Sequence, residues 1–398
     1  MKLILMLMMS QLFFSFHAFA MNPKAGLWRL NIVYPYAKIP FLVEFVAKKN
    51  KWHIQLINGK EIIELDEIKA TAKKWVVPLG LFPTSLELNF QSPKSLTGFF
   101  HSPGKPAIPI QGTFGSYRRF DRPKEEPSIN LNGKWSIQLK NSDGTLTNAI
   151  ALFEQMGQTL HASILTPTGD LRYFDGYVFN NQFKVGGFDG VFHFLFEGVI
   201  KDNKISGSLF SRSISTFEGE FNPKAELKIE NQNKPSEKLS FKFNDLTGKE
   251  ISSEDDQYKN KPLIVQIFGS WCPNCIDETF FLNNWYKENK NKNKDIEIIC
   301  LAFERLGNQA DVLKQLKRFQ AKMELSYPIL IAGVSDSDKP HEKIQGLVQI
   351  QAYPTTLFLD KKHQVYKIHA GFNGPGTGIY FSDFKKYFFQ TIDELKSH

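Results

Sequence analysis

The sequence contains the run Leu263-Ile264-Val265-Gln266-Ile267-Phe268-Gly269-Ser270-Trp271-Cys272-Pro273-Asn274-Cys275, in which two of only three cysteines are separated by two residues. The first six residues are almost all apolar and include β-branched side chains, which is typical of a buried strand. The segment that follows, Ile276–Tyr286, carries apolar residues at helical spacing. Cys272 and Cys275 are therefore predicted to lie at a turn from a strand into a helix.

This position suits reversible dithiol–disulfide chemistry. The thiolate is the reactive species, and the dipole and unpaired N–H groups at a helix N-terminus stabilise it. Cys272 lies nearer the start of the helix, so we expect it to attack, and Cys275 to resolve the mixed disulfide. Pro273 fits the first turn because it lacks an N–H group that would have no partner there. A zinc site would need a second pair of ligands, and the sequence has no second cysteine pair, so no metal is expected.

The composition predicts folded domains that are stabilised by burial. Hydrophobic residues make up 42% of the 398 residues and aromatic residues 14%, which predicts two or three well-filled domains. The net charge is +8, but the lysines are scattered, so no nucleic-acid partner is expected. With only three cysteines, the chain does not rely on structural disulfides. Cys300 ends an apolar run and is expected to be a buried, unreactive thiol.

The first 20 residues have the pattern of a secretory signal peptide. Lys2 precedes an apolar run from Leu3 to Phe16, and Ala18-Phe19-Ala20 forms a small-x-small cleavage signal. The apolar run is shorter than the ~18 residues that a membrane-spanning helix needs. The sequence therefore predicts a signal peptide over residues 1–20 and a soluble exported protein, located in the periplasm of a Gram-negative cell.

The region from about Gly26 to Leu227 is a succession of short alternating segments broken by Gly, Asn, Asp and Pro, which predicts an all-β structure. It also contains an internal repeat. Gly26-Leu27-Trp28 recurs as Gly133-Lys134-Trp135, and Gly112-Thr113-Phe114 recurs as Gly219-Glu220-Phe221, both at an offset of 107. We therefore predict a tandem β repeat of two homologous, meandering antiparallel units.

The first β unit is predicted to cover residues 21–127 and the second residues 128–225, each as a barrel or a sandwich. A Gly-x-Trp start followed by a meander also occurs in lipocalin-like barrels, which bind small apolar ligands, but an interior filled by side chains is the favoured interpretation. In the second unit, Phe192, Phe194 and Phe196 alternate with His193 and Leu195. Because successive strand residues face opposite sides, we expect the three phenylalanines to form the core.

The remainder of the chain follows a different pattern. Residues 226–240 are polar and lack periodicity, which predicts a linker. Within 241–398, strands are predicted at 241–243, 263–268, 296–302, 355–359 and 363–369, and helices after Cys272, at 311–325 and at about 380–395. Alternating strands and helices predict an α/β layer fold.

Five motifs in this last region point to one family. They are Phe-x-Phe-x-Asp-Leu-x-Gly-Lys from Phe241, Lys261-Pro262, Trp271-Cys272-Pro273-Asn274-Cys275, Tyr353-Pro354-Thr355-Thr356 and His369-Ala370-Gly371-Phe372-Asn373-Gly374-Pro375-Gly376-Thr377-Gly378. Over roughly residues 239–396 the chain resembles the TlpA/ResA-type thiol–disulfide oxidoreductases of the thioredoxin-like superfamily, which is related to AhpC/TSA. The resemblance implies a thioredoxin fold with a CxxC redox-active centre, and no cofactor is expected.

The resemblance also implies roles for single residues. Pro354 matches the cis-proline that faces the cysteine pair, and the cis form of an X-Pro bond costs only ~0.5–1 kcal/mol. This turn would expose the backbone of Tyr353 to the substrate, with Trp271 and Thr355 beside it as further substrate-binding residues. Glu278 matches the acidic residue that handles protons.

Two positions depart from the family pattern. Gln266 stands where thioredoxin keeps a buried carboxylate, and Thr279 replaces the proline that is common after the acidic residue. The first departure removes one proton relay, which leaves the expected proton-handling role to Glu278.

The expected function is that of an exported disulfide reductase. Its expected partners are disulfide-containing exported proteins and a membrane-bound thiol donor that recycles the cysteine pair. A thiol peroxidase is one alternative, although Gly269 stands where peroxiredoxins carry Thr. In another alternative, the β repeats bind a partner or ligand and the dithiol is secondary.

Overall fold

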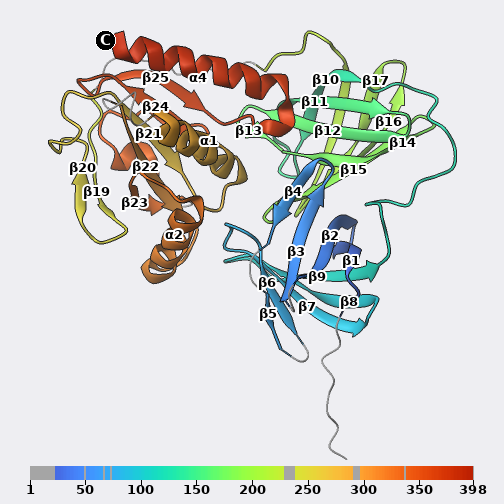
Figure 1. Ribbon diagram of the computed structural model, residues 1–398. Helices are drawn as coiled ribbons and strands as arrows, with labels where there is room; N and C mark the ends of the chain where they lie inside the picture. Colours follow the sequence, from blue (N-terminus) through green and yellow to red (C-terminus); the bar gives the residue numbers. More distant parts are fainter. Residues whose placement is uncertain are drawn as a thin grey trace, which may run out of the picture.

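The computed structural model describes residues 23–48, 51–65, 68–71, 74–227, 238–289, 296–335 and 338–397. Within these ranges the strands form three sheets, which follow one another along the sequence (Figure 1). The predicted signal peptide, 1–20, and most of the predicted linker, 226–240, lie outside the described residues. In the described ranges, no helix has the length and apolar character needed to span a membrane.

The first sheet is antiparallel and has the strand order β4-β3-β2-β1-β9-β8-β7-β6-β5. Its strands are β1 (Gly26–Val33), β2 (Lys38–Lys48), β3 (Lys51–Asn58), β4 (Glu61–Glu64), β5 (Lys69–Ala70), β6 (Trp75–Pro78), β7 (Ser85–Ser92), β8 (Ser95–His101) and β9 (Ile108–Phe114). Within the described residues the edge strands β4 and β5 do not pair with each other. The sheet is therefore an open half-barrel.

The second sheet is also antiparallel, with the order β11-β10-β18-β17-β16-β15-β14-β12-β13, and an additional pairing of β11 with β12 closes it into a barrel. Its strands are β10 (Gly133–Lys140), β11 (Leu146–Met156), β12 (Thr159–Thr166), β13 (Gly169–Asp170), β14 (Phe174–Phe179), β15 (Gln182–Phe188), β16 (His193–Lys201), β17 (Lys204–Phe210) and β18 (Ile214–Phe221). The interior is filled by a cluster that includes Trp135, Phe183, Phe196 and Phe217. The prediction of a filled interior is confirmed.

The predicted repeat is visible in the pairing of the first and last strands of each unit. Trp28 of β1 lies opposite Phe114 of β9, and Trp135 of β10 lies opposite Phe221 of β18, each residue 107 positions after its counterpart. The indole N–H groups of Trp28 and Trp135 each donate to a carbonyl four residues earlier, at 2.9 Å. The two sheets thus share one plan, although only the second closes.

The two β units pack against each other through a shared apolar core. Phe188 and Leu195 of the second unit belong to the same buried cluster as the core of the first unit. Arg119, whose side chain is fully buried, donates to the carboxylate of Asp175 and to the carbonyl oxygens of Pro40 and Ile57. Arg119 lies in the segment that connects β9 with β10. Its buried hydrogen bonds therefore hold this segment against both β units.

The prediction that Phe192, Phe194 and Phe196 all lie in the core is wrong in part. Phe196 is fully buried, but Phe194 is half-buried and Phe192 is 38% exposed. His193 and Leu195, on the opposite face, are 1% and 3% exposed. The first unit covers this opposite face, because Nε2 of His193 lies 2.7 Å from the hydroxyl of Tyr34. The alternation of residues along one strand shows which side chains share a face. It does not show that another unit of the chain covers the second face.

The third sheet has the order β20-β19-β23-β22-β21-β24-β25, in which β22 is parallel to β21 and β23. Its strands are β19 (Lys242–Asp245), β20 (Glu250–Ser252), β21 (Leu263–Phe268), β22 (Glu297–Glu304), β23 (Ile329–Val334), β24 (Thr355–Leu359) and β25 (Val365–Ala370). The helices are α1 (Pro273–Asn289), α2 (Gln309–Met323), α3 (Pro340–Lys343) and α4 (Ile379–Ser397), with a 3-10 turn η1 (Pro375–Thr377). This arrangement is the predicted thioredoxin-like α/β fold.

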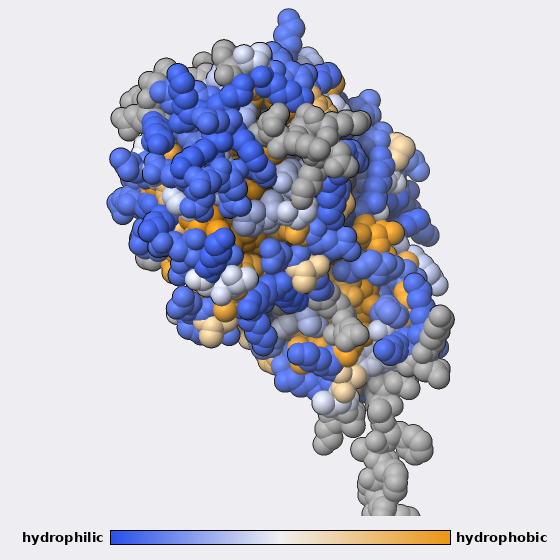
Figure 2. Space-filling view, turned by 60° about the vertical axis from the view of Figure 1, so that its left-hand side comes forward, coloured by the Kyte–Doolittle hydropathy of each residue, from blue (hydrophilic) through white to orange (hydrophobic). Residues whose placement is uncertain are grey.

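Each face of the third sheet is covered by different elements. On one face, Phe268 of β21 packs in a cluster with Leu282 of α1, Leu316 of α2 and Phe388 of α4. On the other, Val265 packs in a cluster with the segment before β19 and residues after α3. The outer surface in Figure 2 is largely hydrophilic, interrupted by hydrophobic patches.

Candidate active site

Cys272 and Cys275 form a disulfide at the start of α1, with their Cα atoms 5.2 Å apart. Cys275 is fully buried and Cys272 is 5% exposed. The backbone N–H of Cys275 donates to Sγ of Cys272 at 3.2 Å. After reduction, this N–H group and the helix N-terminus would stabilise a thiolate on Cys272. The more accessible sulfur is therefore also the one that the backbone favours as a nucleophile.

The loop before β24 lies opposite this disulfide. The peptide bond between Tyr353 and Pro354 is cis, and the carbonyl oxygen of Tyr353 lies 3.6 Å from Sγ of Cys272. The hydroxyl of Thr355 is buried and donates to the carbonyl oxygen of Ala352 at 2.7 Å. The Thr355 side chain therefore shapes the loop, and the backbone of Tyr353 is the part that adjoins the reactive sulfur.

Trp271 is held rigidly beside the disulfide. Its indole N–H donates to the carbonyl oxygen of Phe303 at 2.9 Å. Its ring meets the ring of Tyr353 edge-on, with centroids 5.5 Å apart, and the guanidinium of Arg305 lies 3.4 Å from its centroid. These contacts make Trp271 a fixed wall of the site.

Glu278 is buried on the same helix, one turn beyond Cys275. Its carboxylate accepts a hydrogen bond from Nε2 of Gln266 at 2.8 Å. The amide oxygen of Gln266 in turn accepts from the hydroxyl of Thr279 and the thiol of Cys300, at 2.9 and 3.2 Å. Burial raises the pKa of Glu278 to about 7, so this carboxyl can take up and release a proton near neutral pH.

Burial also raises the pKa of Cys300, well above its ordinary value. The Cys300 thiol is fully buried, as its place in an apolar strand predicts. Burial of this kind makes a thiol unreactive.

A further buried acid, Glu304, was not predicted from the sequence. It ends β22, is 1% exposed, and accepts from the backbone N–H and the hydroxyl of Ser270 at 2.7 and 2.9 Å. Burial raises its pKa. By binding Ser270, Glu304 fixes the turn that precedes Trp271. A charged residue at the end of an otherwise apolar strand was the available signal.

The second β unit contacts the cysteine motif directly, which the sequence did not predict. The side-chain amide of Asn274 donates to the carbonyl oxygen of Asp170 at 3.0 Å and to that of Phe372 at 3.2 Å. The carboxylate of Asp170 accepts from the backbone N–H of Gly374 at 3.1 Å. The hairpin of β12 and β13 therefore packs on the middle of the CxxC motif.

Arg172 connects the two β units with helix α1 of the thioredoxin-like domain. Its guanidinium is paired with Asp277 near the start of α1 and with Glu61 of β4. It also donates to the carbonyl oxygen of Pro273 at 3.4 Å. The Arg172 side chain is only 13% exposed. A positive charge from the barrel is thus held beside the redox motif.

These contacts leave a cavity of about 330 Å³ beside Cys272. The third sheet supplies Trp271, Ala352 and Tyr353 to its walls, and the barrel supplies Leu171, Phe192 and Phe194. The disulfide is therefore reached through a cavity that two units build together.

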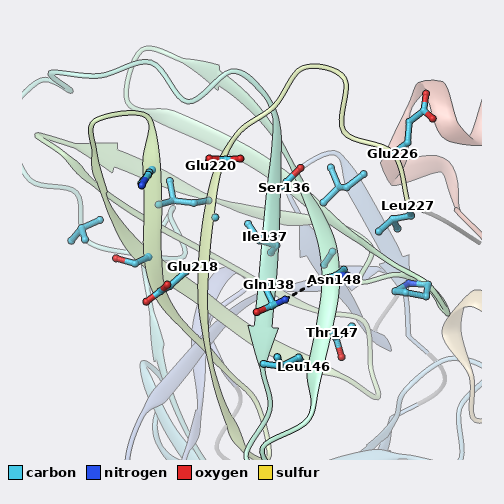
Figure 3. A pocket seen from close by; sticks show the side chains of 18 of the residues that line it. Ser136, Ile137, Gln138, Leu146, Thr147, Asn148, Glu218, Glu220, Glu226 and Leu227 are labelled. Carbon is cyan, nitrogen blue, oxygen red and sulfur yellow. Dashed lines mark hydrogen bonds between the residues drawn. The ribbon is translucent and has the colours of Figure 1, made fainter.

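A second hollow, of about 1260 Å³, lies on the barrel and is lined by both polar and apolar side chains (Figure 3). The side chains of Gln138 on β10 and Asn148 on β11 point into it and are joined by a hydrogen bond of 3.2 Å. Glu218 and Glu220 line the side formed by β18. The lining contains none of the predicted site residues.

Comparisons with known proteins match the C-terminal part of the chain. The family model described as Redoxin matches residues 234–387. The thiol-disulfide oxidoreductase ResA of Bacillus anthracis is 30% identical over 149 residues, which cover 37% of this chain and 73% of that protein. The thioredoxin-like protein YneN of Bacillus subtilis is 28% identical over 131 residues, covering 33% of this chain and 68% of that protein.

Two solved structures also match part of the chain. A DsbF homologue from Corynebacterium diphtheriae is 18% identical, with a TM-score of 0.32, and the match covers 44% of this chain and 97% of that one. StoA from Bacillus subtilis is 20% identical, with a TM-score of 0.26, and the match covers 34% of this chain and 91% of that one. The two β units, Gly26–Phe114 and Gly133–Phe221, lie outside the Redoxin match.

Proposed function

Because the chain belongs to the Redoxin family and to its ResA-type thiol-disulfide oxidoreductases, we propose that it is an exported reductase of protein disulfides. The observation that supports this most directly is the position of the Cys272–Cys275 disulfide at the start of α1, opposite the carbonyl oxygen of Tyr353. A helix N-terminus favours the thiolate, and the carbonyl oxygen of a loop can pair with an extended substrate chain.

In the reducing direction the reaction has two steps. The thiolate of Cys272 attacks one sulfur of the substrate disulfide, whose S–S bond breaks, and the first substrate thiolate leaves and takes up a proton. Cys275 then loses its proton and attacks Sγ of Cys272 in the mixed disulfide. The second substrate thiolate leaves, so that the substrate is reduced to two thiols and the enzyme is oxidised to the Cys272–Cys275 disulfide.

Glu278 is the proposed proton acceptor for the second step. It lies one turn from Cys275, and burial raises its pKa to about 7, which suits a group that takes a proton from a thiol and later returns it. Pro354 is proposed to hold the loop that presents the Tyr353 backbone. Trp271, fixed by Phe303 and Arg305, would flank the substrate.

The proposal includes export and recycling. The pattern of residues 1–20 supports cleavage after Ala20, which would place the enzyme in the cell envelope with disulfide-containing exported proteins as substrates. A membrane-bound thiol donor would then return the cysteine pair to the dithiol. Mass spectrometry of the protein from an envelope fraction should find a chain that begins at Met21, and an uncleaved chain in the cytoplasm would contradict export.

The redox activity is tested by single turnover. Purified protein, reduced with dithiothreitol and desalted, should convert one peptide disulfide into two thiols. Cys275→Ser should accumulate a mixed disulfide at Cys272, and Cys272→Ser should release no thiol; equal activity of Cys272→Ser and wild type would refute the mechanism. A reduction potential near −120 mV, where strong oxidants lie, would refute the reducing direction.

A further inference from the structure

The cavity beside Cys272 has walls from two parts of the chain, and one of them lies outside the redox domain. Phe192 and Phe194 of the barrel face this cavity together with Trp271 and Tyr353. The rings of Phe192 and Phe194 are stacked, with centroids 6.1 Å apart. Phe192 stays 38% exposed although it lies beside a well-packed core. The aromatic rings from both parts of the chain therefore line one cavity next to Cys272, as in a binding site for an apolar group.

The charged groups of the cavity are already occupied by partners within the protein. The carboxylate of Asp170 accepts from the backbone N–H groups of Gly374 and Arg172, and that of Asp189 accepts from those of Val191 and Phe192. Arg172 is paired with Glu61 and Asp277. A charged substrate group entering the cavity would lose water, and the carboxylates and the guanidinium that it would meet already have hydrogen-bond or ion-pair partners within the protein. The lining therefore favours an uncharged, apolar group.

The volume also limits the occupant. About 330 Å³ is at the lower end of the ~300–1,000 Å³ of small-ligand clefts, which suits one large side chain rather than a folded surface. The barrel hairpin at Asp170 is fixed to the CxxC motif through Asn274. The cavity is therefore a formed part of the site and does not depend on a flexible loop.

We propose that the second β unit forms a specificity pocket of the enzyme, which takes a large apolar side chain next to the cysteine of the target disulfide. This inference rests on the proposed reductase function and identifies its substrate class. The segment carrying the target cysteine would pass the Tyr353 loop, so that Cys272 reaches the disulfide while the neighbouring side chain enters between Phe192 and Trp271. The reaction itself is the balanced two-step exchange described above.

The test compares peptide disulfides in single-turnover reactions with the full chain in its dithiol form. The peptides differ only in the residue beside the cysteine: Phe, Ala, Lys or Glu. Each second-order rate constant is divided by that of the same variant for a small disulfide without neighbouring side chains. We expect wild type to prefer the Phe peptide over the Lys and Glu peptides by roughly tenfold or more.

Variants of Phe192 test whether this preference depends on the pocket. Phe192→Ala should reduce the preference for Phe to less than threefold, and Phe192→Glu should turn it toward Lys. Phe99→Ala and Phe99→Glu are matched controls, because Phe99 is 41% exposed on β8 and does not line the cavity. These controls should keep the wild-type preference.

The outcomes separate the pocket from the reductase function. If wild type reduces all four peptides equally, or if Phe192→Glu and Phe99→Glu have the same profile, the pocket is refuted and the reductase function stands. If wild type reduces neither the peptides nor the small disulfide, the reductase function is refuted, and the role of the pocket with it. Circular dichroism of each variant confirms that it is folded.

Discussion

The guanidinium of Arg172, which follows the barrel strand β13, forms an ion pair with the carboxylate of Asp277 near the start of α1. The same guanidinium is paired with Glu61 of the first β unit. One side chain thus connects the redox helix to both β units. The three side chains are 12–18% exposed, so these charges interact in an environment that is largely shielded from water.

Arg172→Met should destabilise the folded protein strongly. Removing one member of a buried ion cluster leaves the carboxylates of Glu61 and Asp277 without their partner, which typically costs ~3–5 kcal/mol. Lys60→Met is the matched control, because Lys60 also pairs between units, with Glu154, but the two side chains are 65% and 58% exposed. This control should cost ~0.2–1 kcal/mol. Denaturant unfolding measures the loss of unfolding free energy in both variants. Similar losses in the two variants would contradict the structural role of Arg172.

Gly169→Ala should disturb the contact between the barrel and the cysteine motif. A Cβ atom at Gly169 would lie 2.3 Å from Nδ2 of Asn274, and the backbone there has φ +124°. Asn274 would have to give up its hydrogen bonds to Asp170 and Phe372. Gly144 also has positive φ, but a Cβ atom there would have nothing within 4 Å.

Gly144→Ala therefore measures the cost of a positive φ without any overlap, ~1–3 kcal/mol. The overlap at Gly169 should add ~1–3 kcal/mol to it. Hydrogen exchange should also be faster in residues 164–172 of Gly169→Ala. Equal unfolding free energies of the two variants would show that the contact contributes nothing.

Glu278→Gln should change the pH dependence of turnover. Since the pKa of Glu278 is about 7, its carboxyl is a proton acceptor only above this pH, and the wild-type rate should rise through an inflection near pH 7. The variant should lose the inflection and be slower by roughly 10²-fold. Single-turnover rates between pH 5 and 9 measure this. Glu288→Gln, at an exposed position on α1, is the control and should keep the wild-type pH profile. If Glu278→Gln also keeps the inflection near pH 7, the inflection belongs to another group.

The same substitution should change how stability varies with pH. Burial raises the pKa of Glu278 from 4.5 to about 7, so the folded state binds this proton more tightly than the unfolded state does. Its contribution is complete below pH 4.5 and is lost as the pH rises to about 7. Relative to Glu278→Gln, wild type should lose roughly 3 kcal/mol of unfolding free energy across this range, at ~1.36 kcal/mol per pKa unit. If the difference in unfolding free energy between wild type and Glu278→Gln does not change with pH, burial does not raise the pKa of the Glu278 carboxyl.

Cys300 should not react with alkylating reagents in the folded protein. Its thiol is fully buried, donates to Gln266, and has a pKa well above its ordinary value because of burial. After reduction, iodoacetamide should modify Cys272 in the native state and reach Cys300 only in denaturant, as peptide mass spectrometry would show. Equal labelling of both cysteines in the native state would contradict this packing.

Local sequence patterns predicted much of this protein. The apolar run Leu263–Phe268, the cysteines at the turn and the periodic residues of α2 depend on interactions between near neighbours, so the redox fold could be predicted from them. The repeated Gly-x-Trp and Gly-x-Phe segments predicted two β units, because a strand and its turns are encoded within about ten residues. The burial of Cys300 also followed from its own strand.

Other features depend on contacts between distant segments. No local pattern indicated that β16 would be covered on both faces, or that Phe192 would stay exposed and line a cavity. Glu304, Asp170 and Arg172 look like ordinary charged residues in the sequence, and their importance comes from Ser270, Gly374 and Asp277, which lie 34, 204 and 105 positions away.

The sequence by itself determined the chemistry of this protein, since a CxxC pair at a helix N-terminus needs only its own strand, turn and helix. The tertiary structure alone decided which surfaces surround that pair. Packing brings the barrel hairpin onto Asn274 and places Phe192 in the wall of the cavity that Cys272 also lines. Burial and ion pairing act between surfaces whatever their separation along the chain.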